Sequence, residues 1–331
     1  MCTYNGSEFL KKQLDSITSQ TRTLNELIVC DDCSSDGTIQ ILNDYVETAK
    51  FPVTIRCNVN RLGAPKNFEQ GIALTQGDVI VLSDQDDVWR DDKLQILEQV
   101  LSQNPNAGYA FSDAIIIDED GKTVSPSLWQ RVSFNSKRRA LFSRSPMDQL
   151  RVLVGKSVVT GATMAFRSSL KPIVLPIREL WIHDEWIAFA SSLQGNWGVP
   201  VQAPLIYYRQ HTAQAIGVPQ QGFWGLLKRG RKYFSGDVQA YDYYERELRK
   251  WNILYALLKG SASQGLPVLP LVEAKVAHVT LRAKLYRKSR AIRLAAIMGE
   301  LIRGRYHFYS AGYKSAIKDL LVPMASDLRL A

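Results

Sequence analysis

Residues 79–89, VIVLSDQDDVW, decide how this chain is interpreted. Four apolar residues come first, and Asp84, Asp86 and Asp87 follow within four positions. The apolar run predicts a buried strand, and the carboxylates at its end repel one another unless a cation compensates them. A hard divalent cation prefers oxygen ligands and shares them with substrate phosphates. The stretch therefore predicts a metal site. Taken alone, such a short motif more often means a solvated acidic turn before a helix, here one beginning near Asp91.

A second acidic stretch, residues 27–38 (LIVCDDCSSDGT), has the same design. Its apolar run ends in Asp31 and Asp32, so this strand also brings carboxylates to its C-terminal end. A carboxylate at Asp32 can accept a hydrogen bond from the N3–H group of a pyrimidine ring. Asp36 is better explained as part of a capped helix start, because Ser and Asp favour that position.

The first 120 residues alternate strand-like and helix-like patterns. The predicted elements are strands at 27–30, 53–56 and 79–82, and helices at 9–20, 39–45 and 68–74. This alternation predicts an α/β fold with a doubly wound, mostly parallel sheet and flanking helices. Ligands of such sheets bind beyond the carboxyl ends of the strands, which is where both acidic stretches lie.

The rest of the chain divides into two regions of different character. Residues 107–219 predict further strands and loops, whereas residues 220–331 predict a helical region interrupted at Pro267 and Pro270. Within that region, residues 274–301 mix Lys and Arg with Leu, Ile, Val and Ala. This pattern predicts a long amphipathic segment.

Charge is distributed unevenly along the chain. Residues 220–331 hold 20 Lys and Arg against 8 Asp and Glu, whereas residues 1–219 hold 21 against 24. A basic block of this kind predicts an anionic partner, either a membrane surface or nucleic acid, and a solvated helical surface is the alternative. The block contains no zinc-ligand spacing and no RNA-binding signature, which argues against nucleic acid.

The cysteines and the opening residues bear on cellular location. The chain has four cysteines, at Cys2, Cys30, Cys33 and Cys57. They lack the partners and spacing of a zinc site, so we expect free thiols. No apolar run approaches the ~20 residues of a membrane-spanning helix, and residues 1–4 do not look like a signal peptide. We therefore expect a cytoplasmic protein.

Together with Thr3-Tyr4-Asn5-Gly6 upstream, the two acidic stretches resemble the family 2 glycosyltransferases of the GT-A fold. Further segments match that family in order along nearly the whole chain. They are Asn60, Gly63, Lys66 and Asn67 with Gly77-Asp78, then residues 160–166 (TGATMAF), 183–186 (HDEW), 208–211 (YRQH), 304–306 (GRY) and 318–321 (KDLL). Residues 208–211 and the C-terminal matches resemble a rhamnosyltransferase branch of the family.

The resemblance implies roles on the donor side. Asp86 and His211 would bind Mn²⁺ or Mg²⁺, and Asp84 or Asp87 would assist through the metal, water or the ribose. The residues implied in nucleotide-sugar binding are Thr3, Tyr4, Asn5, Asp32, Lys66, Asn67, Asp84, Gln85 and Arg209.

The resemblance also implies roles on the acceptor side. Asp184 would be the general base that removes the proton from the acceptor hydroxyl, and the neighbouring Glu185 is its competitor. Gly161 and Trp186 would belong to the acceptor side of the site.

The implied domain organisation follows from the order of these motifs. It consists of a catalytic domain at 1–219, with a nucleotide-binding half at 1–105 and an acceptor-binding half at 106–219, and a basic helical region at 220–331. Only Met1 and Cys2 precede the Thr3-Tyr4-Asn5-Gly6 turn. We therefore expect a short first strand, lower stability and a less complete nucleotide pocket.

The implied function is inverting transfer of a sugar, with L-rhamnose from dTDP-L-rhamnose as the expected donor. The expected acceptor is a saccharide or lipid-linked glycan, as in O-antigen or capsule assembly. Residues 223–232, which combine Phe223 and Trp224 with four cations, could lie peripherally on an anionic membrane.

Three other functions compete with this interpretation. A sugar nucleotidyltransferase would need a Gly-rich phosphate loop near the start, which the chain lacks. A nucleic-acid-binding protein would use the basic tail and would bind with a steep salt dependence. A non-catalytic scaffold would share the fold, but Asp84, Asp86, Asp184 and His211 are all retained.

Overall fold

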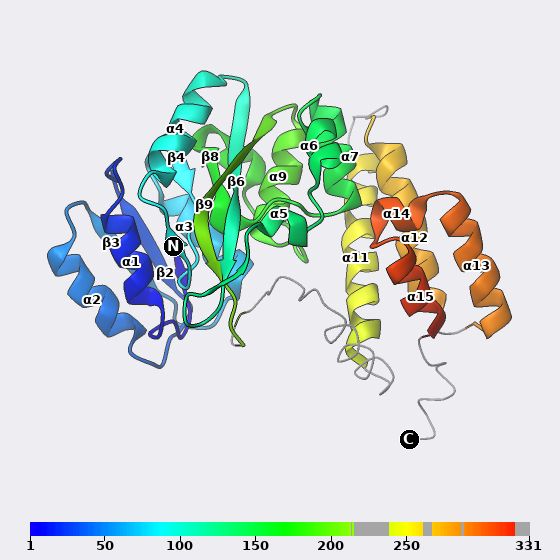
Figure 1. Ribbon diagram of the computed structural model, residues 1–331, viewed down its shortest axis with the longest axis horizontal. Helices are drawn as coiled ribbons and strands as arrows, with labels where there is room; N and C mark the ends of the chain where they lie inside the picture. Colours follow the sequence, from blue (N-terminus) through cyan, green and yellow to red (C-terminus); the bar gives the residue numbers. More distant parts are fainter. Residues whose placement is uncertain (213, 215–237, 261–266, 286–287, 322–331) are drawn as a thin grey trace. The chain divides into compact units, whose positions relative to one another are not determined.

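The computed structural model of the protein (Figure 1) describes residues 1–212, 214, 238–260, 267–285 and 288–321. The chain forms two compact units. The first contains residues 1–149 and 157–218, and the second contains residues 150–156 and 219–331. The segment 223–232, predicted to contact a membrane, lies outside the described residues.

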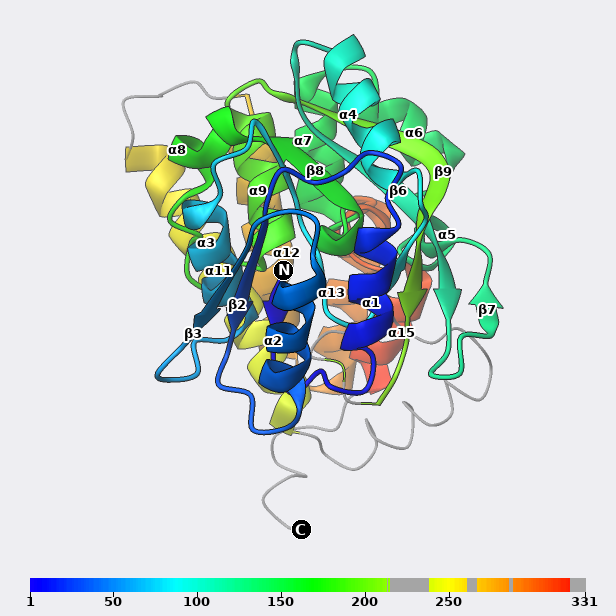
Figure 2. The same ribbon diagram turned by 90° about the vertical axis from the view of Figure 1, so that its left-hand side faces the viewer.

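The first unit begins with the parallel sheet β1-β2-β3. The elements of this half are β1 (Cys2–Thr3), α1 (Leu10–Thr18), β2 (Leu27–Asp31), α2 (Thr38–Thr48), β3 (Val53–Cys57), α3 (Ala64–Leu74), β4 (Val79–Val81), β5 (Val88–Trp89) and α4 (Lys93–Gln103). Leu27 and Val29 of β2 pack in one core with α1 and α2. Helix α3 covers the opposite face, where a Cβ on Gly71 would contact the Cys30 sulfur (Figures 1 and 2). The predicted alternation of strands and helices is confirmed.

A second sheet has the order β4-β8-β6-β9-β5, and β7 pairs with β6. Its further strands are β6 (Ala107–Ile117), β7 (Thr123–Ser125), β8 (Met164–Arg167) and β9 (Trp197–Arg209). Strands β6 and β9 are parallel, and β8 runs antiparallel between β4 and β6. The Cys2 N–H donates to the Ser83 carbonyl at 3.3 Å, so the two sheets meet where β4 ends. The α/β fold class is confirmed, with antiparallel strands added in the second half.

Residues 107–219 contain helices, so the expectation of strands and loops alone was wrong. The helices are α5 (Leu128–Arg131), α6 (Ser136–Phe142), α7 (Pro146–Gly155), α8 (Lys171–Val174) and α9 (His183–Leu193), together with 3₁₀ turns at Gly161–Thr163 and Ser168–Leu170. Several of these helices are only one or two turns long. Helix α9 is buried on nearly every side, so its sequence has no polar stripe to reveal a helical period.

The second unit is helical, as predicted. Its helices are α11 (Val238–Gly260), α12 (Leu269–Leu285), α13 (Arg290–Ile302), α14 (Arg305–Tyr309) and α15 (Tyr313–Leu321). Residues 274–301 therefore belong to two helices rather than one. Pro270 lies in the first turn of α12, where a missing N–H breaks no helical hydrogen bond.

Two expectations concern the chain as a whole. All four cysteines are free thiols, as expected. Among the described helices, none combines the length and the apolar character needed to cross a bilayer.

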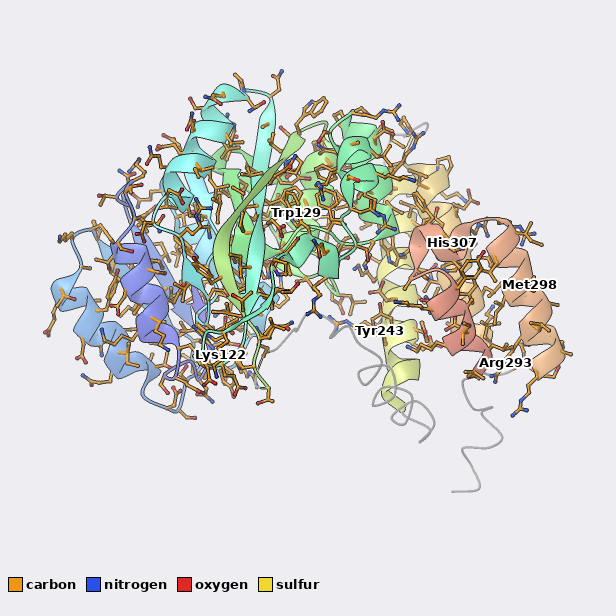
Figure 3. All side chains as sticks on the ribbon, viewed as in Figure 1. Lys122, Trp129, Tyr243, Arg293, Met298 and His307 are labelled. Atoms are coloured by element: carbon orange, nitrogen blue, oxygen red, sulfur yellow. The ribbon has the colours of Figure 1, made fainter. Side chains whose placement is uncertain are left out.

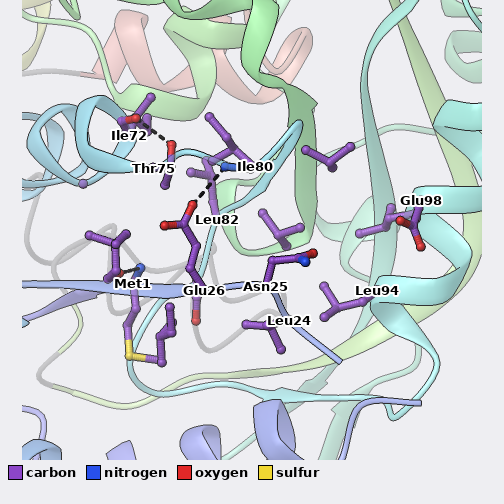
Figure 4. A pocket seen from close by; sticks show the side chains of 18 of the residues that line it. Met1, Leu24, Asn25, Glu26, Ile72, Thr75, Ile80, Leu82, Leu94 and Glu98 are labelled. Atoms are coloured by element: carbon purple, nitrogen blue, oxygen red, sulfur yellow. Dashed lines mark hydrogen bonds between the residues drawn. The ribbon is translucent and has the colours of Figure 1, made fainter. Parts of the chain in front are cut away.

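A cavity of about 200 Å³ lies beside β2 and β4 (Figure 4). It is lined by Met1 and by apolar side chains that include Leu24, Ile80, Leu82 and Leu94. Strand β1 has only two residues, as expected, and beside it the Met1 amine donates to the Ile28 carbonyl at 2.7 Å. The cavity adjoins this end of β1, and Leu82 and Ser83, which follow β4, also line it.

Candidate active site

Asp86 and His211 form the centre of the candidate site. Asp86 lies in the loop after β4, and His211 lies two residues beyond the end of β9. The Nε2 atom of His211 is 2.8 Å from Oδ2 of Asp86, and the imidazole ring packs on Phe9 with ring centroids 4.9 Å apart. Asp86 and His211 are 125 residues apart in the sequence, and the pairing of β5 with β9 brings them together.

The neighbouring carboxylates are protonated more readily than usual. Burial, followed by the charges of Asp86 and Asp184, raises the pKa of Asp84 to about 7. Burial and the charges of Asp86 and Asp84 also raise the pKa of Asp87 well above its ordinary value. Asp87 is 1% exposed, and its Oδ1 accepts the backbone N–H of Arg209 at 3.0 Å. The loop thus concentrates more negative charge than the protein around it neutralises.

Lys93 is a buried cation beneath this loop that sequence reasoning missed. Its ammonium group donates to the Ala162 carbonyl at 2.8 Å and lies 3.7 Å from the centroid of the Trp89 ring. Burial lowers the pKa of Lys93 to about 7, although the charges of Asp87 and Asp84 oppose that shift. No local pattern distinguishes Lys93 from a surface lysine at the start of α4.

The Asp86–His211 pair fits a metal that binds together with a phosphorylated ligand. In the part of the chain that the structure describes, no three or more His, Cys, Asp or Glu side chains gather as a metal site. The pair offers one oxygen and one nitrogen ligand. Mg²⁺ is typically bound by one or two carboxylates while substrate phosphates and water complete its shell, so Asp86 is the ligand that fits such an ion best and His211 adds a nitrogen ligand beside it.

The turn after β1 is connected to both acidic stretches. Thr3 Oγ1 donates to Asp31 at 2.7 Å, and Asn5, at φ +45°, accepts the Ser35 N–H through its side-chain oxygen at 2.8 Å. The Gln85 amide accepts the Tyr4 N–H at 2.8 Å and donates to the Tyr4 carbonyl at 3.0 Å. Thr3, Asn5 and Gln85 therefore hold this turn in place, and the Tyr4 ring is partly exposed above it.

Tyr4 carries a cation on its ring face. The Arg61 guanidinium lies 3.7 Å from the ring centroid. An exposed aromatic ring paired with Arg offers a stacking surface for a planar group such as a nucleobase. Sequence reasoning missed Arg61, although it lies between Asn60 and Gly63, two of the residues that match the family.

Asp32 organises the loop that contains Arg61. Its carboxylate accepts the N–H groups of Leu62 at 2.7 Å and Gly63 at 2.8 Å, and the Asn58 amide at 3.0 Å. Asn67 lies below this loop, 1% exposed, and donates to the Cys30 carbonyl at 2.7 Å. The arrangement makes Asn67 a support for the loop rather than part of its surface.

Lys66 and Arg209 differ in their surroundings. Lys66 is exposed at the start of α3 and forms an ion pair with Glu69 at 2.7 Å. The Arg209 guanidinium is buried, donating to the carbonyls of Asp86 at 2.9 Å and Asp118 at 3.0 Å. Arg209 therefore anchors the acidic loop to the turn after β6.

Asp184 lies at the start of α9 and is held by backbone groups. Its Oδ2 accepts the Gly161 N–H at 2.7 Å, and its Oδ1 accepts the Glu185 N–H at 2.6 Å. The charge of Asp184 contributes to the raised pKa of Asp84, so the two carboxylates are near enough to repel one another. Trp186 lies deeper, where its indole N–H donates to the Val174 carbonyl at 2.8 Å.

The comparison with family models decides the family. The model for glycosyl transferase family 2 matches residues 1–171, which is more than half of the chain.

The chain belongs to glycosyl transferase family 2.

Curated relatives of this family 2 glycosyltransferase include proteins named as transferases of rhamnose and abequose. It is 26% identical to dTDP-rhamnosyl transferase RfbG of Shigella flexneri over 66% of this chain and 73% of that protein. It is 30% identical to an uncharacterized glycosyltransferase of Nostoc sp., over 63% of each chain. Abequosyltransferase RfbV of Salmonella typhimurium is 33% identical over 30% of each chain. This chain thus spans less than two thirds of the last two relatives.

A solved structure shows the same fold. S. aureus TarS 1-349 in complex with UDP-GlcNAc matches with a TM-score of 0.51 at 14% identity, covering 95% of this chain and 88% of that one. The GT-A type fold expected for this family 2 glycosyltransferase is confirmed. With the family shown, the chain is a glycosyltransferase that uses a nucleotide-sugar donor.

Proposed function

We propose that this protein is an inverting, metal-dependent transferase that moves L-rhamnose from dTDP-L-rhamnose to a glycan of the cell surface. The observation that carries the proposal is the Asp86–His211 pair, 2.8 Å apart, beside Asp84, whose pKa is raised by burial and by the charges of Asp86 and Asp184. The name of the Shigella flexneri relative supports rhamnose as the sugar. The Salmonella typhimurium relative supports an O-antigen-type glycan as the product.

Asp86 and His211 would hold Mn²⁺ or Mg²⁺ against the diphosphate of the donor. When bound, the ion would neutralise the charge that develops on the leaving nucleoside diphosphate. Without the ion, a hydrogen bond between His211 and Asp86 holds the two side chains together, and bonds to the ion would replace it. Asp84 and Asp87, whose pKa values are raised by burial, would regain full charge as cations enter the site.

Asp184 would act as the general base. The Gly161 and Glu185 N–H groups occupy one lone pair on each carboxylate oxygen and fix its orientation. A remaining lone pair can take the proton of the acceptor hydroxyl as that oxygen attacks the anomeric carbon from the side opposite the leaving group. One displacement of this kind inverts the anomeric configuration without a covalent enzyme intermediate.

The donor nucleotide would lie along the ends of β1 and β2. Tyr4 with Arg61 would stack on the base, while Asp32 would approach it from the loop below. Lys66 would contact the donor from the start of α3. Thr3, Asn5, Asn67, Gln85 and Arg209 would act by holding these groups in place.

The same proposal assigns donor binding, acceptor binding and membrane contact to different segments of the chain. Residues 1–105 would bind the nucleotide sugar, and residues 106–219, including Gly161 and Trp186, would form the acceptor side. The basic region 220–331 would lie against a membrane that carries a lipid-linked acceptor.

Titration calorimetry of the full chain with dTDP, UDP and GDP, with and without Mn²⁺, tests the proposal. We expect tight binding of dTDP only when Mn²⁺ is present, because neither partner alone completes the ion's shell. Asp86→Asn should weaken that binding about 10- to 100-fold. The matched control Asp15→Asn removes an exposed carboxylate of α1 and should leave binding unchanged.

Release of dTDP from dTDP-L-rhamnose, together with transfer to a glycan acceptor, is the second measurement. Preference for UDP or GDP would overturn the rhamnose donor. Metal-dependent binding of dTDP without any turnover would favour a non-catalytic scaffold with the same fold. Absence of nucleotide binding by folded protein would overturn the proposal altogether.

A further inference from the structure

Helix α13 reverses the usual distribution of apolar and charged residues on a surface helix. Its two ionic residues within the helix body, Arg293 and Glu300, are 1% and 2% exposed. Leu294, Met298 and Ile302 are exposed, and Ile302 reaches 82%. Figure 3 labels Arg293 and Met298 on this helix. These three residues are four positions apart, so they form one stripe along the helix. We call them the α13 stripe.

The buried ionic residues of α13 are fully engaged. Glu300 accepts hydrogen bonds from His278 at 2.7 Å and Arg305 at 3.1 Å. The Arg293 guanidinium donates to the carbonyls of Leu285 at 2.8 Å and Lys288 at 3.0 Å. Because these contacts fix which face turns inward, the helix cannot rotate to bury its apolar stripe without breaking them.

The exposed face of α13 contains no charge at all between its two ends. Every exposed residue from 291 to 302 is Ala, Ile, Leu or Met. A continuous apolar surface of this kind is uncommon on a protein that meets only water, and it marks an interaction surface.

A second stripe lies on the neighbouring helix. Tyr313, Ile317 and Leu321 of α15 are exposed and are also four positions apart. Helices α13 and α15 pack together through a small core that includes Ile297 and Ala316. The two stripes therefore belong to one pair of packed helices.

Within residues 288–321, the exposed charges all have one sign. In residues 288–321 the only acidic residues are Glu300 and Asp319, and both are buried. The exposed ionic residues of this segment are Lys and Arg, among them Lys288, Arg290 and Arg303 at the ends of α13. Arg303 pairs with the buried Glu300 at 3.7 Å, but the described residues of this segment include no exposed carboxylate, so the surface combines apolar side chains with net positive charge.

We propose that α13 and α15 form a docking surface for an anionic lipid bilayer. The apolar stripes enter the boundary between headgroups and acyl chains, while the flanking cations bind lipid phosphates. A second copy of this chain fits the surface poorly, because pairing the two copies would bring cations against cations without any exposed carboxylate between them. This inference names the surface that would make the membrane contact proposed above for residues 220–331, and it rests on that part of the proposed function; it does not depend on the sugar transfer itself.

Co-sedimentation of the full chain with vesicles, without any nucleotide sugar, tests the docking surface. We expect binding to phosphatidylcholine vesicles that contain phosphatidylglycerol and little binding to phosphatidylcholine alone. The double substitution Leu294→Glu and Met298→Glu should weaken binding by about tenfold or more, because it removes apolar contact and adds repelled charge. Arg290→Gln should weaken binding about fivefold.

The matched control is Val46→Glu, which places the same charge at an exposed apolar position of α2 in the first unit. It should leave vesicle binding unchanged, and circular dichroism should show that all variants are folded. Binding that survives the double substitution would overturn the proposal and move the contact to another segment, such as residues 223–232. Absence of vesicle binding would also overturn it, as would a dimer in solution that the double substitution dissociates.

Discussion

At the residue scale, two backbone N–H groups hold the Asp184 carboxylate in position. One of them comes from Gly161, where a Cβ would lie 2.7 Å from Nε2 of His183. Glycine is therefore the residue that lets the 160–166 segment approach α9 closely enough to orient the carboxylate. The two N–H groups fix the orientation of the Asp184 carboxylate, which suits a base that must accept a proton from one direction.

Asp184→Asn tests the assigned base. The amide keeps the shape of the side chain but cannot accept a proton, so kcat should fall about 10²- to 10⁴-fold while nucleotide affinity is retained. The measurement is steady-state sugar transfer together with dTDP titration. Glu185→Gln is the matched comparison, and a larger loss of kcat there than in Asp184→Asn would reassign the base.

His183 predicts how stability depends on pH. Both its ring nitrogens are buried without a hydrogen-bond partner, its ring stacks on Phe68 at 3.8 Å, and burial lowers its pKa to about 3. The unfolded chain binds a proton at this residue below a pH of about 6.5 and the folded chain does not. Folding therefore loses stability as pH falls from about 6.5 toward 3, by up to about 1.4 kcal/mol per pH unit.

Urea denaturation at pH 7 and pH 5 measures this dependence. His183→Gln removes the titrating group, so the variant should lose less stability than the wild type between these two values. The comparison between variant and wild type is needed because Asp84, with its pKa raised to about 7, contributes in the opposite direction. Equal losses in both proteins would contradict the buried, neutral imidazole.

At the scale of elements, the candidate site is assembled from loops that follow strand ends. The turn after β1, the loop after β2 and the loop after β4 come from different parts of the sequence, and hydrogen bonds join them directly. Gln85 is the connection between the first and the third, and Gly6 leaves the space that the Gln85 side chain fills. A change in the position of the acidic loop should therefore also move Tyr4, which we propose as part of the nucleotide-binding surface.

Gln85→Ala tests that connection. Two hydrogen bonds to the Tyr4 backbone are lost, so dTDP affinity should fall about tenfold while the overall fold is retained. Calorimetry gives the affinity, and thermal unfolding reports the fold. Gln40→Ala removes an exposed amide of α2 that bonds only to Asp44, and should leave affinity unchanged. Equal affinities in all three proteins would contradict the coupling.

At the scale of the whole molecule, the two units are stabilised by different interactions. The first has an apolar core between sheets and helices. The second has a small apolar core and a buried ionic network, in which Arg282 binds Asp319 at 2.6 Å and the Tyr306 hydroxyl donates to the same carboxylate at 2.8 Å. Stability of the helical unit should depend on that network.

Asp319→Asn tests this dependence. It leaves the Arg282 charge buried without its partner, so the second unit should lose about 3–5 kcal/mol of stability. Asp120→Asn breaks an exposed pair with Lys122 and should cost about 1 kcal/mol or less. Chemical denaturation followed by circular dichroism measures both. Equal effects would show that the network adds nothing beyond a surface ion pair.

The sequence by itself determined the alternation of strands and helices, the strand ends that carry acidic residues, and the helical C-terminal region. These features depend on side-chain periodicity over a few residues, which each segment carries locally. The helices of residues 107–219 escaped prediction because nearly uniform burial removes that periodicity, as in α9.

Only the tertiary structure decided which side chains meet. It brought His211 to Asp86 across 125 residues and placed Lys93 beneath the acidic loop. It also turned the ionic residues of α13 inward and left its apolar stripe exposed. The physical reason is that such contacts depend on how all elements pack together. A short segment of sequence does not specify which of its faces a distant element will cover.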